Sequence, residues 1–159
     1  MGIGDFFDYP GTADSGRTAT AAQTLGADWS SERWSRLREH TDVLHVHRGE
    51  HLIRRSEPQH ALLLVEEGRL DVVKPTRGRR LVVVATVGPG AILGEQSFFD
   101  GMPHTADVVA VTDCQVRRLS TVGVERLSAR HPEIARALLM ELGRILSVRL
   151  RAAESLAEA

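Results

Sequence analysis

The sequence predicts a mainly β domain with flanking helices, in which the strands form an antiparallel sandwich or roll. Short apolar runs recur at close, regular spacing between residues 43 and 119. Several of the turns that separate these runs contain glycine, as is typical of hairpins. Segments with a helical spacing of apolar residues stand before and after this region. This combination of short strands and glycine turns favours antiparallel pairing around one core.

Length and composition set limits on the class of protein. A chain of 159 residues with 42% hydrophobic content can build one ordinary domain core and is too short for two domains. Its 20 basic and 21 acidic side chains leave a formal charge of −1, which gives no net attraction to DNA or to an anionic membrane. The single cysteine, Cys114, lies in an alternating strand pattern, and we expect it to be a small buried hydrophobe.

The same features favour a cytoplasmic protein. The longest apolar runs, 61–65 and 81–87, are far shorter than a membrane span. The first five residues lack the basic start of a signal peptide. One cysteine permits no internal disulfide and suits a reducing compartment.

Residues 1–27 form a low-complexity segment of small and polar residues with no period and little to bury. Phe6, Phe7 and Tyr9 stand between acidic residues near its start. They fit either a short docking peptide or an ordinary chain terminus that carries a few aromatic residues. We place the folded domain at residues 28–159.

The elements of this domain follow in order along the chain. Asp28 or Ser30 can cap a first helix that runs to about Arg38, with Trp34 and Leu37 on one face. Seven strands are then predicted from alternation and turn signals, at residues 43–47, 52–54, 61–65, 70–74, 81–87, 106–111 and 114–119.

Two helices complete the domain. Ser120 can cap a helix that ends near Ala129, and Pro132 suits the first turn of a last helix over residues 132–156. The last helix carries apolar residues at spacings of three and four, at Leu138, Leu142, Ile145, Leu146 and Leu150. Such a stripe is typical of a helix that packs on a core.

The stretch from Val87 to Val108 interrupts the series of strands. Gly88, Pro89 and Gly90 predict a tight turn, and Gly94-Glu95 opens a single helical turn. The first turn of a helix leaves backbone N–H groups unpaired, and these favour a bound anion.

Several motifs occur together in the order typical of one family: Gly49-Glu50, Glu67-Gly68-Arg69, Gly88-Pro89-Gly90, Gly94-Glu95 and His131-Pro132-Glu133. From Trp29 to Arg151 the chain resembles the cyclic-nucleotide-binding domain of catabolite-activator-type regulators. The resemblance implies an antiparallel eight-stranded β-roll, also described as a double-stranded β-helix or jelly roll, with an N-terminal helix and C-terminal helices. It also implies that the last helix covers the ligand and in many members pairs with a second copy.

The resemblance further implies a set of ligand-binding residues: Gly94, Glu95, Gln96, Ser97, His104 and Thr105. In the family the glutamate, here Glu95, accepts from the ribose hydroxyl, and N–H groups near Gln96 and Ser97 hold the phosphate. The arginine that pairs with the phosphate is replaced by His104. The ligand would be cAMP or cGMP, with weak or altered binding, unless Arg54 or Arg55 supplies the missing charge.

Two functions remain open from the sequence. One is a regulatory domain that binds a cyclic nucleotide and acts in trans on a protein partner, with a homodimer through the C-terminal helix as one arrangement. The other is a ligand-free adaptor in a larger assembly. The chain ends too soon after the helix for the DNA-binding domain of related transcription factors, so we expect a stand-alone domain.

Other site classes have little support. His45 and His47 share one face of a predicted strand and His51 follows, but two strand histidines without a third ligand predict no metal site. The basic hairpin tip at residues 74–80 is typical of a solvated turn. No nucleophile with a neighbouring base is present, and Glu95 has no evident acid partner. We therefore expect no enzyme activity.

Overall fold

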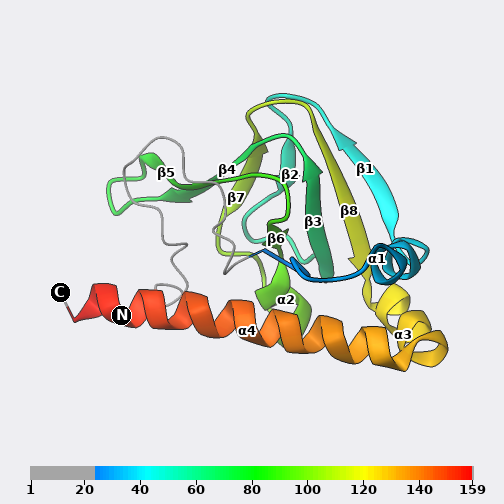
Figure 1. The fold of residues 1–159 in the computed structure, drawn as a ribbon. Coiled ribbons are helices and arrows are strands. Elements are labelled where there is room, and N and C mark those ends of the chain that lie inside the picture. The colour runs from blue at the N-terminus through cyan, green and yellow to red at the C-terminus, as the bar shows by residue number, and fades with distance from the viewer. Residues whose placement is uncertain (1–23, 159) are drawn as a thin grey trace.

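The protein, in a computed structural model that describes residues 24–158, is built around two four-stranded antiparallel sheets (Figure 1). One sheet has the strand order β1-β8-β3-β6 and the other β2-β7-β4-β5. The strands are β1 (Asp42–Val46), β2 (His51–Ile53), β3 (Ala61–Glu67), β4 (Leu70–Pro75), β5 (Leu81–Val87), β6 (Ile92–Leu93), β7 (Asp107–Ala110) and β8 (Cys114–Ser120). The predicted antiparallel eight-stranded β-roll is therefore confirmed.

Strand β6 is the one strand that alternation of apolar and polar residues did not predict. It contains only Ile92 and Leu93, which pair with Leu64 and Leu63 of β3. Two residues cannot display a period, so the pairing becomes visible only when β3 lies beside them. The strand holds the segment that follows it against the roll.

Four helices flank the sheets: α1 (Ser31–Arg38), α2 (Glu95–Asp100), α3 (Thr121–Arg130) and α4 (Pro132–Ala157). The caps are those that the sequence predicts. Ser30 Oγ accepts a hydrogen bond from the N–H of Arg33 at 3.2 Å, and Ser120 Oγ accepts one from Gly123 at 3.0 Å. Between residues 24 and 158 no helix has both the length and the apolar character needed to cross a bilayer.

The interior of the roll is the first of two apolar cores. Alternate residues of facing strands from both sheets fill it, and its largest fully buried side chains are Leu63, Val65, Leu70, Val72, Leu93 and Val116. Cys114 lies in this core with 5% of its surface exposed, which confirms the expected small buried hydrophobe. Because both sheets bury one face here, the register of each strand is firmly specified.

The second core lies between the roll and the helices, where α4 runs along one side of the sheets (Figure 1). Leu138, Leu142 and Ile145 of α4 are at most 1% exposed within it. The prediction that Leu150 continues this stripe is wrong, because its side chain is 37% exposed. At the spacing of 138, 142 and 145, the next inward position is 149, and Arg149 occupies it with 3% exposure.

Residues 24–26 tie the start of the described chain to two distant elements. Thr24 forms an isolated bridge with Ala91, and the N–H of Leu25 donates to the carbonyl of Gly90 at 3.2 Å. Gly26 N–H donates to Glu141 Oε2 of α4 at 3.1 Å. Leu25 itself is buried in the second core, so the end of the polar segment predicted over 1–27 packs on the domain. The aromatic residues at 6, 7 and 9 lie outside the described residues.

Candidate functional site

The segment from Gly88 to Thr105, which we call the cassette, leaves the roll through a glycine turn. The N–H of Ala91 donates to the carbonyl of Gly88 at 3.1 Å, and Gly90 has a φ of 89°. After β6 the chain turns again at Gly94, whose φ is 76°. A Cβ at Gly94 would stand 2.8 Å from the carbonyl oxygen of Ala61, so both conformation and space require glycine there.

Helix α2 begins at this glycine. Its first internal hydrogen bond joins the N–H of Phe98 to the carbonyl of Gly94 at 3.0 Å. The N–H groups of residues 95–97 precede that bond, so they have no partner within the helix. The helix is short because Gly101 reverses the chain at a φ of 69°.

The cassette and the roll enclose one cavity, and all six residues predicted to bind a ligand line it. Gly94, Glu95, Gln96 and Ser97 come from the start of α2, and His104 and Thr105 come from the end of the cassette. The other walls are apolar and belong to the roll and its entry into β7: Ile53, Val72, Ala106 and Val108. The cavity volume is about 40 Å³, whereas ligand pockets usually measure about 300–1,000 Å³. A nucleotide would enter only if the cassette opened around it.

Glu95 is buried in the cassette and forms an ion pair with helix α4. Its Oε1 accepts a hydrogen bond from Arg149 Nη1, and the side chains are 4% and 3% exposed. Arg149 Nη2 also donates to the carbonyl of Ile92 at 3.1 Å. The other carboxylate oxygen of Glu95, Oε2, is buried without a hydrogen-bond partner among residues 24–158. An unpaired buried acceptor is costly, so this oxygen favours a hydroxyl or N–H donor from a ligand.

His104 faces the other side of the cavity. Its Nδ1 lies 3.2 Å from Ser97 Oγ, and the carbonyl of Ser97 lies 3.2 Å from Nδ1 of His60. Burial lowers the pKa of the His104 imidazole below its ordinary value, and a hydrogen bond with the backbone of Gln59 and the carboxylate of Glu95 offset only part of this. At neutral pH the ring is therefore uncharged and supplies hydrogen-bonding atoms without a positive charge.

The structure does not bring Arg54 or Arg55 into the cavity lining. Both residues are exposed in the turn after β2, where the N–H of Arg55 donates to Asp107 Oδ1 at 2.7 Å. The basic side chain that contacts the candidate site is instead Arg149. The sequence pattern missed it because Arg149 lies 54 residues from Glu95 and occupies an apolar stripe position.

Comparison with known proteins identifies the class of this domain. The family profile described as cyclic nucleotide-binding domain matches residues 43–131, which is more than half of the chain. The chain belongs to the cyclic nucleotide-binding domain family.

Solved structures and curated sequences agree with this assignment. A cyclic nucleotide-binding domain from Methylobacillus flagellatus is 30% identical with a TM-score of 0.74, over 85% of this chain and 77% of that one. The catabolite activator protein of Thermus thermophilus shares the fold with a TM-score of 0.75 at 23% identity, over 83% of this chain and 60% of that one.

A curated relative is the CRP-like cAMP-activated global transcriptional regulator of Mycobacterium tuberculosis. It is 27% identical over 104 residues, which make up 65% of this chain and 45% of the regulator. The chain therefore spans less than half the length of that relative.

Proposed function

We propose that the cassette cavity binds a cyclic nucleotide weakly and that the occupied domain regulates a protein partner in trans. The observation that carries this proposal is Glu95 Oε2, a buried acceptor without a partner among residues 24–158. A ribose 2′-hydroxyl is a donor of the right kind for this oxygen. Glu95 Oε1 remains paired with Arg149, so the carboxylate stays oriented while its second oxygen accepts.

The phosphate of the ligand would lie against the start of α2. The N–H groups of residues 95–97 and the hydroxyl of Ser97 stand on one side of the cavity, and Thr105 supplies a further hydroxyl. An arginine at position 104 would add a bidentate contact to the phosphate, which a neutral imidazole cannot make. Loss of one member of a buried charge pair typically costs about 2–5 kcal/mol, or roughly 30- to several thousand-fold in affinity.

Titration calorimetry with cAMP and cGMP tests this proposal. We expect weak binding by the wild-type chain and an affinity at least about 30-fold higher for His104→Arg, since that substitution restores the charge. His45→Arg adds the same charge on an exposed position of β1 and should leave the affinity unchanged. Glu95→Gln, in a chain that keeps His104, replaces the carboxylate by a neutral amide and should abolish binding. Absence of binding by both the wild type and His104→Arg would contradict the proposal.

The cavity volume of about 40 Å³ favours a second candidate function, that of a ligand-free adaptor. Such a protein would use its surface, and α4 offers apolar side chains outside the core: Leu139 is 43% exposed and Met140 71%. Leu150 extends this face and would also serve a homodimer formed through the helix. Sedimentation velocity of Leu139→Glu beside the wild type separates a dimer, which the substitution should dissociate, from a monomeric adaptor.

A further inference from the structure

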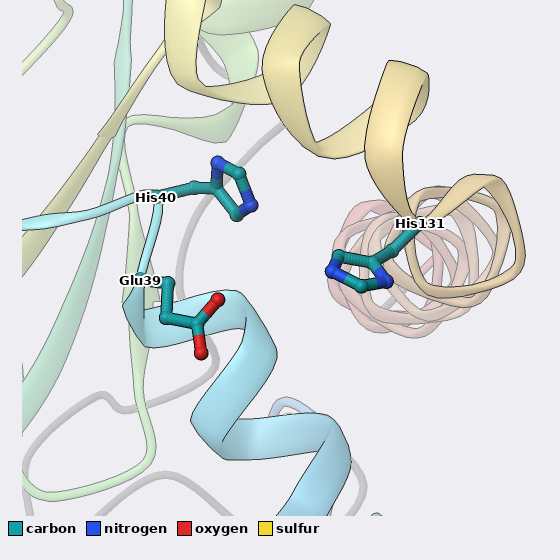
Figure 2. Close-up of side chains that lie close together, drawn as sticks. All are labelled: Glu39, His40 and His131. Carbon is teal, nitrogen blue, oxygen red and sulfur yellow. The ribbon is translucent and has the colours of Figure 1, made fainter.

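A second group of potential ligands lies outside the cassette, where the end of α1 meets the junction of α3 and α4. It consists of Glu39, His40 and His131. Figure 2 shows the three side chains directed into one common space, two of them from the turn after α1 and one from the junction. One ligand atom from each residue lies within 4.8 Å of the other two. The sequence does not suggest this group, because position 131 is about 90 residues from positions 39 and 40.

Helix ends fix the backbone of all three residues. Glu39 is the C-cap of α1, and its N–H donates to the carbonyl of Ser35 at 3.2 Å. His131 stands between α3 and α4, and its N–H donates to the carbonyl of Leu127 at 2.7 Å. Gly123 of α3 approaches closely, since a Cβ there would lie 2.7 Å from the carbonyl oxygen of His40. The two parts of the group are therefore held together by the fold and need only side-chain rotation to converge.

His40 provides an available nitrogen donor. Its Nε2 is buried without a hydrogen-bond partner within the described chain, residues 24–158. An imidazole nitrogen is a common metal ligand, and this one has no competing hydrogen bond among those residues.

Carboxylates balance the charge of an ion at this place. Glu39 Oε1 lies 3.9 Å from Arg36 Nη1. This ion pair is loose and exposed, so the carboxylate of Glu39 can turn away from it. Glu133 lies 3.8 Å from His131 Nδ1, so a second carboxylate stands beside the group. Two histidines and a glutamate form a ligand set typical of Zn²⁺, and they leave a fourth position for water.

We propose that Glu39, His40 and His131 bind a divalent transition metal ion of the Zn²⁺ type. Ligand atoms around tetrahedral Zn²⁺ stand about 3.4 Å apart, given metal–ligand bonds of about 2.0–2.1 Å. The side chain of Glu39 is 54% exposed, so more than half of its surface faces solvent into which it can rotate. The ion would join the end of α1 to the start of α4.

Solvent can reach this place through a groove beside it. The groove has a volume of about 310 Å³, and Arg33, Arg36, His131 and Glu133 are among the residues that line it. An ion can enter by this path, and water can occupy the fourth position. The site is separate from the cassette, and its proposal does not depend on nucleotide binding.

Titration of the whole chain with ZnCl₂, after treatment with EDTA and dialysis, tests the proposal. Competition with a chromophoric chelator should show one equivalent of Zn²⁺ bound with micromolar or better affinity. His40→Gln and His131→Gln should each weaken that affinity at least tenfold, because each removes one of three protein ligands. His45→Gln, the same substitution at an exposed position of β1, should change it less than twofold.

Cobalt provides a second readout that depends on the ligand set. Co²⁺ bound by the wild type should give visible absorption bands of a tetrahedral centre, and these should disappear in His131→Gln. Thermal melting in EDTA checks that each variant folds. If His40→Gln does not fold, the single variants Glu39→Gln and His131→Gln carry the test. Lack of wild-type binding at 100-fold excess of ZnCl₂ over protein, or equal binding by the folded variants, would overturn the proposal.

Discussion

The two halves of helix α4 are attached to the roll by different kinds of contact. The first half, together with Ile145 just after its midpoint, buries Leu138 and Leu142 in a continuous apolar core. The second half places Arg149 against Glu95, a single buried ion pair at the cassette. An apolar contact holds the helix whatever the cassette contains, whereas the ion pair depends on the state of one carboxylate. The first half is thus a fixed anchor, and the second half can respond to whatever Glu95 binds.

The largest expected effect comes from breaking the polar contact on one side only. Arg149→Ala leaves the carboxylate of Glu95 buried without its partner and should lower the free energy of unfolding by about 3–5 kcal/mol, measured by urea denaturation. The double variant Glu95→Gln with Arg149→Met removes both charges and should recover most of that loss. A cost below about 1 kcal/mol for Arg149→Ala would mean that the ion pair does not anchor the second half.

Substitution in the apolar half of α4 should lower the free energy of unfolding nearly as much. No second substitution in the cassette should recover that loss. Leu142→Ala removes a fully buried side chain and should cost about 2–5 kcal/mol in urea denaturation. Leu139→Ala, on the outer face of the same helix, should change stability by less than about 0.5 kcal/mol. Similar losses for the two leucines would show that the helix is not oriented as described.

Two glycine substitutions, one in the cassette and one in α4, should change stability in opposite directions. Gly94→Ala forces a Cβ against the carbonyl of Ala61 at a positive φ and should destabilise by about 1–3 kcal/mol. Gly143→Ala lies in the interior of α4, where a Cβ would meet nothing within 4 Å, and should stabilise by about 0.5–1 kcal/mol. Thermal melting measures both, and a shift of the same sign in the two variants would be inconsistent with this geometry.

The smallest effect concerns pH. The pKa of His104 is lowered in the folded chain, so below about pH 6.5 the unfolded chain takes up a proton more readily than the folded one. Stability contributed by the neutral imidazole is complete above that pH and declines as the pH falls. We expect the urea midpoint to fall between pH 7 and 5, less steeply in His104→Gln. An identical slope in the variant would exclude His104 as a source of the pH dependence.

Periodic patterns predicted most of the fold, and the glycine motifs predicted where the cavity lies. Gly94 marks the cassette in the sequence because only glycine suits its φ of 76° beside a neighbouring carbonyl. Arg149 was missed because a charged residue in a helix is usually assigned to the solvent-facing side. Its inward position becomes evident only when Glu95 is found opposite it. Long-range pairs of this kind, as with His40 and His131, carry no local signal in a single sequence.

The bonds of residues 24–26 connect this helix to the beginning of the domain. Thr24 and Leu25 join the chain beside the Gly90 turn, and Gly26 is held by Glu141. Arg144 Nη2 also donates to the carbonyl of Thr24 at 3.2 Å. Any displacement of the helix from the sheets would stretch these bonds and pull on the backbone at position 24. A change at Glu95 that displaces the helix would thus be transmitted mechanically to residues 24–26.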